Sequence, residues 1–235
     1  MSGATVRAHL RGDDRVDPLA IVARTARVYG GHARLLVAIG IAVFVPVALA
    51  RAALGAARPV GLAVASALEL GAMFVVQGAI TWAVARMRTA PGTVPRVLDA
   101  VRAAPRWLPR LAAAGALAAA GIMAGLVAGV IPGLVLLTWW LVVAPVIVVE
   151  GRGVFAAFGR SRALVAGHGW AVFGVAVATL AAQLVLSLAL AAGLNAVDAV
   201  AAGPLAVAIG SSIAAPWVAT AWTLTYLDLR AAEER

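Results

Sequence analysis

The chain has 235 residues, of which 63% are hydrophobic and 12% are charged, and its formal net charge is +9. Soluble domains carry about a quarter charged residues, so this composition indicates an integral membrane protein and leaves no room for a separate water-soluble domain. The absence of cysteine excludes disulfides, iron–sulfur clusters and thiolate nucleophiles. All nineteen basic residues are arginine. Positive charge beside apolar segments is the usual orientation signal of membrane proteins, so we do not expect a nucleic-acid site.

The first segment is polar and carries Asp13 and Asp14 where a signal peptide would need its apolar region. We therefore expect a disordered cytoplasmic N-terminus at residues 1–16. A single six-span membrane domain should follow at 17–230, with a cytoplasmic tail at 231–235.

Six apolar segments follow, and a helix needs about 20 such residues to cross a bilayer. They cover residues 35–50, 60–84, 111–131, 133–149, 170–193 and 200–226. The third and fourth form one long apolar stretch broken only by the dipeptide Pro132–Gly133, which predicts a tight turn there. Seventeen of the nineteen arginines lie before the first span, between spans two and three, between four and five, or after the sixth. By the positive-inside rule, both termini face the cytoplasm. We expect the protein to lie in the cell (inner or plasma) membrane.

Each pair of spans follows an arginine-rich segment with helical periodicity. In the first, Leu19, Val22, Ala26 and Tyr29 share one face, which predicts an amphipathic helix lying on the membrane surface. Residues 24–32 (RTARVYGGH) also align without gaps with residues 160–168 (RSRALVAGH) in the third segment. The predicted fold is therefore an all-α integral membrane protein of six transmembrane helices. It has three repeats of an interfacial amphipathic helix plus a transmembrane hairpin, at about 17–84, 93–149 and 152–226.

Three motifs carry a resemblance to a known family. They are residues 145–150 (PVIVVE) with 156–161, Leu164, Gly167 and Trp170; residues 24–46; and residues 226–230 (YLDLR) with Glu233. Most of the chain resembles a bacterial family, of actinobacterial type, named for the membrane domain of glycerophosphoryl diester phosphodiesterases. Phe158 and Gly159 depart from its pattern, where Leu and a variable residue are usual. The catalytic barrel behind the family name needs about 250 residues, and none of it is in this sequence, so the resemblance implies a membrane domain and no phosphodiesterase activity.

The best-marked candidate site combines Glu150, Arg152, Arg160 and Ser161, with Arg24 at the position equivalent to Arg160. In one interpretation, the arginines bind an anionic headgroup or a partner protein, and Ser161 assists. In the other, Glu150 accepts a hydrogen bond from Arg160 or Arg152 and fixes the surface helix against the bundle.

A second candidate is Glu69, about nine residues and ~13 Å into the second span. A carboxylate at that depth is costly, which makes it either a functional residue or a partner of Arg51. Gln77, Gln183 and Asn195 are further polar residues within spans. Gly121, Gly125 and Gly129 form a small-residue stripe for helix packing, within the chain or between chains.

The sequence contains no Ser/His/Asp grouping, nucleotide fingerprint or HExxH motif, and we expect no cofactor or metal. We expect a non-enzymatic multi-pass membrane protein, acting as a scaffold or partner subunit. Its arginine-rich cytoplasmic face would bind anionic lipid headgroups, or a membrane or cytoplasmic protein. The alternative is a small transporter or lipid-translocating protein that uses Glu69 and proline-broken helices. An enzyme acting on lipid phosphodiesters is suggested only by the family name.

Overall fold

The computed structural model describes residues 18–54, 59–90, 94–196 and 204–234, and all regular structure in these ranges is helical. The long helices are α2 (Pro18–Leu54), α3 (Pro59–Thr89), α5 (Leu108–Ala128), α9 (Gly169–Ala196) and α10 (Pro204–Glu233). The shorter ones are α4 (Val97–Ala103), η1 (Ala104–Arg106), α6 (Val130–Trp140), α7 (Val143–Glu150) and α8 (Val154–Val165). The all-α prediction is confirmed, whereas the expected N-terminus at 1–16 lies outside the described residues.

In the described ranges, five helical stretches are long and apolar enough to cross a membrane. They are Pro18–Ala53, Ser66–Thr89, Leu108–Ala128, Val130–Glu150 and Gly169–Leu186. Five such stretches identify a membrane protein. The sequence predicts six spans, and α10, which carries the expected sixth, is not among the five.

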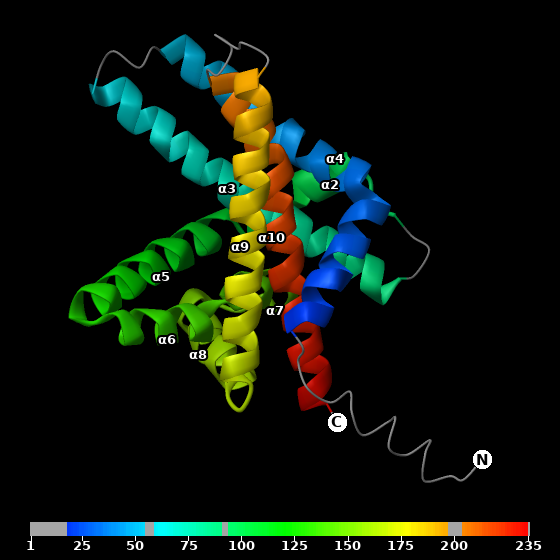
Figure 1. Ribbon diagram of the computed structural model, residues 1–235, viewed down its shortest axis with the longest axis vertical. Helices are drawn as coiled ribbons and strands as arrows, with labels where there is room; N and C mark the ends of the chain where they lie inside the picture. Colours follow the sequence, from blue (N-terminus) through cyan, green and yellow to red (C-terminus); the bar gives the residue numbers. More distant parts are fainter. Residues whose placement is uncertain (1–17, 55–58, 91–93, 197–203, 235) are drawn as a thin grey trace.

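Helix α10 lies in the middle of the molecule, beside α9 (Figure 1). It contacts α2, α3, α7, α8 and α9. Two apolar cores meet on it, because Tyr226 and Leu229 belong to one core while Ala219 and Leu224 belong to the other.

The central helix is rich in hydroxyl side chains that are fully buried. Ser212, Thr220, Thr223 and Thr225 each donate a hydrogen bond to the backbone carbonyl four residues earlier, at 2.7–2.9 Å. These bonds satisfy the hydroxyl groups inside the helix itself. The polar residues of α10 are therefore compatible with a position at the centre of an apolar bundle.

Two helix breaks divide long apolar stretches. Helix α2 kinks at His32 (φ −127°, ψ 21°), at the boundary that the sequence predicts between the first surface helix and the first span. The second break separates α6 from α7 at Leu141 and Val142. Pro145 accounts for this break, because proline has no N–H and its ring collides with the carbonyl of Leu141, four residues earlier.

The predicted turn at Pro132 and Gly133 is wrong. Helix α5 ends at Gly129, whose φ of 153° suits only glycine, and Pro132 lies in the first turn of α6, where proline is well tolerated. The glycine at position 129 is thus the turn residue and not a member of the packing stripe.

On two of the surface segments, some side chains are buried against the bundle and others are exposed. In the first, the buried residues are Ile21 and Thr25, while Leu19 is exposed. In α4, alanines such as Ala100 face the interior and Leu98 is exposed. Large apolar side chains such as Leu19 and Leu98 therefore point outward from these segments.

Candidate functional site

Glu150 ends α7 at the centre of a hydrogen-bonded cluster. Arg152 Nε donates to its carboxylate at 2.5 Å, and Arg160 Nε does so at 3.2 Å. The Tyr226 hydroxyl donates from α10 at 3.0 Å. Gly151, with a φ of 68°, ends the helix in a left-handed conformation and lets the chain turn back so that Arg152 reaches Glu150.

All three guanidinium nitrogens of Arg160 donate hydrogen bonds to carboxylates of the protein. Its Nη1 and Nη2 atoms donate to the two carboxylate oxygens of Glu233, both at 2.6 Å, while Nε donates to Glu150. The hydrogen bonds to Glu233 raise the pKa of Arg160, and the same contact lowers the pKa of Glu233. This geometry favours the interpretation of Arg160 as a structural ion pair over a phosphate ligand.

Ser161 and Arg24 have similar structural contacts. The Ser161 hydroxyl is buried and donates to the backbone carbonyl of Trp139 at 2.6 Å, which ties α8 to α6. Arg24 donates through Nη1 to both oxygens of Asp228 on α10, at 2.7 and 2.9 Å. Arg24 and Arg160, which are equivalent in the sequence alignment, therefore each hold an acidic residue near the end of α10.

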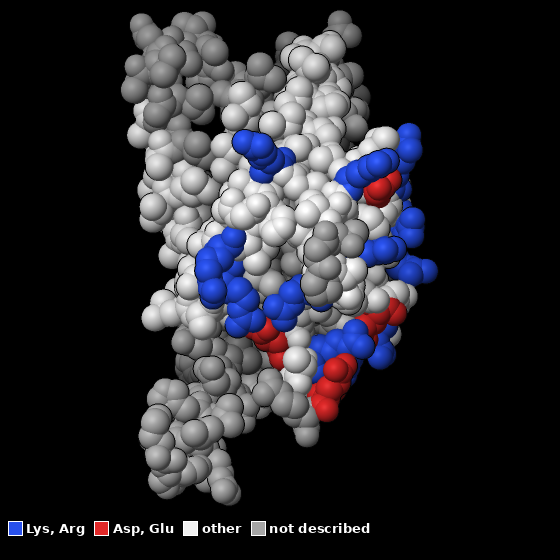
Figure 2. Space-filling view, turned by 90° about the vertical axis from the view of Figure 1, so that its right-hand side faces the viewer, with Lys and Arg blue, Asp and Glu red and all other residues white. Residues whose placement is uncertain are grey.

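Seven arginines in the described ranges form no side-chain hydrogen bond and no ion pair within the described protein. They are Arg27, Arg34, Arg86, Arg96, Arg102, Arg106 and Arg162. We call them the unpaired arginines. In Figure 2, arginines gather over the middle and lower parts of one face, with acidic side chains among them, and the white surface above carries no charge.

Three of the unpaired arginines lie over tryptophan rings. The guanidinium carbons are 5.3 Å from the ring centre for Arg86 on Trp82, 5.2 Å for Arg106 on Trp107, and 4.4 Å for Arg162 on Trp139. A cation–π contact holds the arginine stem against an apolar surface without using its N–H donors. Tryptophan beside arginine is also typical of the membrane–water interface.

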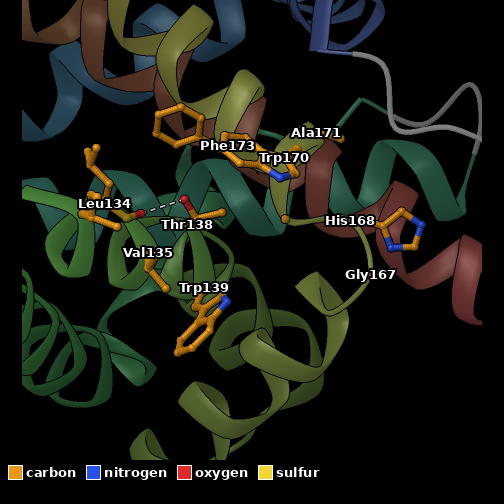
Figure 3. A pocket seen from close by; sticks show the side chains of 11 residues that line it. Leu134, Val135, Thr138, Trp139, Gly167, His168, Trp170, Ala171 and Phe173 are labelled. Carbon is orange, nitrogen blue, oxygen red and sulfur yellow. Dashed lines mark hydrogen bonds between the residues drawn. The ribbon is translucent and has the colours of Figure 1, made fainter.

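A groove of about 940 Å³ lies between α6 and the start of α9. Its lining is mainly apolar and includes Leu134, Trp139, Trp170 and Phe173 (Figure 3). Because Trp139 both lines the groove and carries Arg162, a positive charge sits at its edge.

Glu69 is paired rather than isolated. Arg51 Nη1 donates to its carboxylate at 2.5 Å, so the arginine at the end of the first span does reach inward. Glu69 lines a groove of about 470 Å³ that Ser66 and Ser211 also line. The side chains of Arg51 and Glu69 are both partly exposed. Their contact is the ion pair that the sequence predicts as the structural alternative to a functional Glu69.

Two glycines of the predicted stripe pack within the chain. A Cβ atom on Gly125 would lie 2.9 Å from the Gly133 backbone, and one on Gly121 would lie 2.6 Å from the Trp140 ring. The stripe therefore joins α5 to the helix that follows it.

Comparison with family models, curated proteins and solved structures finds no match to this chain. The site is therefore interpreted from its own contacts. Sequence reasoning did not place Asp228, Glu233 or Tyr226 in the site. These residues could have been predicted from the low number of acidic residues. Clustered arginines pair with the few carboxylates that lie near them.

Proposed function

We propose that this chain is a non-enzymatic scaffold or partner subunit of the cell membrane, and that its unpaired arginines bind anionic lipid headgroups. The proposal includes six spans, with α10 as the sixth, and both termini in the cytoplasm. It also includes three units, each a surface helix followed by a hairpin. The kink at His32 and the similar roles of Arg24 and Arg160 support this arrangement.

The observation that carries the proposal is the surplus of positive charge. In the described chain, Glu150, Asp228 and Glu233 already accept from other arginines, so they do not neutralise the unpaired seven. A guanidinium group binds phosphate through two parallel N–H donors. Juxtamembrane basic residues each contribute about 1 kcal/mol to binding an anionic leaflet.

Exposed apolar side chains on the surface helices add a second attraction to lipid. Leu19, Leu98 and Phe155 are 74%, 53% and 80% exposed, and each lies on a different surface segment. An apolar side chain beside arginine is the pattern of a helix that rests in the interface with its apolar residues inserted. These residues would anchor the surface helices beside the headgroups.

The groove that Trp139 lines would hold the acyl chain of the same phospholipid. A headgroup phosphate would lie against Arg162, and an acyl chain would lie along Leu134 and Phe173. The proposed lipid is therefore anionic at the α8 end of the groove and apolar along α6 and α9.

The test compares two arginines of equal charge. We would purify wild-type protein, Arg162→Gln and Arg230→Gln in mild detergent, add phosphatidylglycerol or phosphatidylcholine, and count bound lipids by native mass spectrometry. We expect wild-type protein and Arg230→Gln to retain phosphatidylglycerol preferentially. Arg162→Gln should lose about fivefold in affinity, as expected for removing one charge-assisted contact of roughly 1 kcal/mol.

Arg230 is the matched control because it pairs with Glu234 at 3.1 Å and contributes little free charge. Equal retention of both lipids by wild-type protein would contradict the proposal, as would equal losses in the two variants. A protein that co-purifies and is lost in Arg162→Gln would instead support the partner-protein alternative.

The transport alternative receives less support. Its key residue, Glu69, already pairs with Arg51. We therefore interpret the pair as structural. The resemblance to the glycerophosphodiester membrane-domain family remains a proposal, and its implication of a membrane domain without a catalytic barrel is compatible with a non-enzymatic role.

A further inference from the structure

A second cavity, of about 360 Å³, lies within the bundle where α3, α5, α9 and α10 meet the break between α6 and α7. Its lining is mostly apolar and aromatic, and includes Phe74 and Trp140. Gln183 of α9 lines it as well, and so do two further polar side chains on different helices, Gln77 of α3 and Trp222 of α10. The arginine-rich face contributes no residue to this lining.

Both of these polar groups lack a hydrogen-bond partner. The Gln77 Nε2 and Trp222 Nε1 atoms are buried and contact no acceptor in the described protein. A buried N–H donor without an acceptor costs free energy, so the great majority of such groups are paired. The two donors therefore point to an acceptor that a ligand would supply.

The helix break borders the same cavity. Leu141 lines it, and Pro145 has no N–H to donate to the Leu141 carbonyl in the usual helical pattern. Interrupted backbone at membrane depth is tolerated where it is buried in protein or borders a polar cavity. In other membrane proteins, binding sites are built around such discontinuous helices.

The position of the cavity restricts the ligand to uncharged, lipid-soluble molecules. Gln77 lies halfway along the Ser66–Thr89 stretch, about 17 Å from each end at 1.5 Å per residue. None of the described residues that line the cavity is Asp, Glu, Lys, Arg or His. Met73 and Leu180 line it as well and are 49% and 43% exposed, so the cavity is reachable from the bilayer between α3 and α9.

We propose that this cavity binds an uncharged lipid-soluble molecule whose carbonyl oxygens accept hydrogen bonds from Gln77 and Trp222. The aromatic rings of Phe74 and Trp140 would pack against its body. Two classes of uncharged lipid-soluble molecule carry such carbonyl oxygens: prenylated quinones in their ring and uncharged glycerolipids in their ester groups. The site is independent of headgroup binding by the arginines.

The experiment measures the affinity of the purified full chain for two probes. One is a naphthoquinone with a single prenyl group, and the other is 1,2-dioctanoylglycerol. Titrations in phosphatidylcholine nanodiscs would be made with wild-type protein, Gln77→Leu and Trp222→Phe. We expect one probe to bind, and each substitution to weaken that binding about fivefold, as expected for one lost hydrogen bond.

Trp217→Phe is the matched control. Trp217 is also on α10 and its Nε1 atom is also buried without a partner, but it does not line the cavity. This variant should bind the probe as wild-type protein does. Because the Gln77 and Trp222 donors have no protein partner, their removal should leave the unfolding midpoint of the unliganded protein unchanged or slightly higher, which separates loss of binding from loss of folding.

Binding of the quinone alone would identify the ring carbonyls as the ligand group, and binding of the diacylglycerol alone would identify the esters. Failure of both probes to bind would overturn the proposal. Binding that is equally strong in Gln77→Leu, Trp222→Phe and Trp217→Phe would overturn it too, since the probe would then sit elsewhere.

Discussion

At the scale of single residues, Glu150 concentrates the polar contacts at the end of α7. Its carboxylate accepts from Arg152, Arg160 and Tyr226, which come from three different parts of the chain. Its side chain is 12% exposed and that of Arg160 is 20% exposed, so water only partly replaces a lost contact. The cluster therefore stabilises the way in which α7, α8 and α10 meet.

We expect Glu150→Gln to lower the free energy of unfolding by about 1–3 kcal/mol, because Arg160 and Tyr226 would lose their charged acceptor. Chemical denaturation in mixed micelles, followed by circular dichroism, would measure this change. Glu234→Gln is the control, since its exposed pair with Arg230 should contribute no more than about 0.5 kcal/mol. Equal stability of both variants would show that the cluster does not hold the helices together.

At the scale of helices, close approach of α2 to α10 depends on Gly40. A Cβ atom at this position would lie 2.5 Å from the Ser212 carbonyl oxygen, and this neighbour is backbone that cannot rotate away. The two helices thus pack at a distance that only glycine allows. Since Arg24 lies near the start of α2, the contact also sets where Arg24 meets Asp228.

Gly40→Ala should therefore destabilise the protein, by about 1–3 kcal/mol, because the helices must move apart. Gly71→Ala in α3 makes the same chemical change where nothing lies within 4 Å. It should be neutral or stabilising by up to about 1 kcal/mol. Denaturation curves of the two variants, measured side by side, would test the contact, and similar curves would exclude it.

The elements also show which features the sequence can predict. The helical class follows from hydropathy, which is a local feature. The junction at His32 follows from the Gly-His motif that ends the repeated segment 24–32, which is local too. The turn at Gly129 was missed because Pro132 and Gly133 have equally strong turn propensity, and only packing of Gly133 on Gly125 decides between them. Glu150 was predicted as a partner of Arg160, whereas Glu233 was missed because it is 73 residues away in the chain.

At the scale of the whole molecule, the distribution of arginine predicts the orientation of the chain in the membrane. The chain contains no cysteine, so single cysteines can report the exposure of chosen positions without background labelling. Thr89→Cys and Glu234→Cys should react with a membrane-impermeant maleimide only after the membrane is opened. Val130→Cys, at the start of α6, is 64% exposed and should react in intact cells. Labelling of Glu234→Cys in intact cells would refute the proposed topology.

Both apolar cores remain incomplete until α10 has been synthesised. Helix α10 is made after every other described helix, yet it supplies Leu224 to one core and Tyr226 to the other. Arg24, among the first helical residues to emerge, has its acceptor at Asp228, 204 positions later. Until α10 is synthesised, the earlier helices therefore expose the surfaces that α10 later covers. A nascent chain is most vulnerable to membrane proteases and to mispairing of helices at that stage.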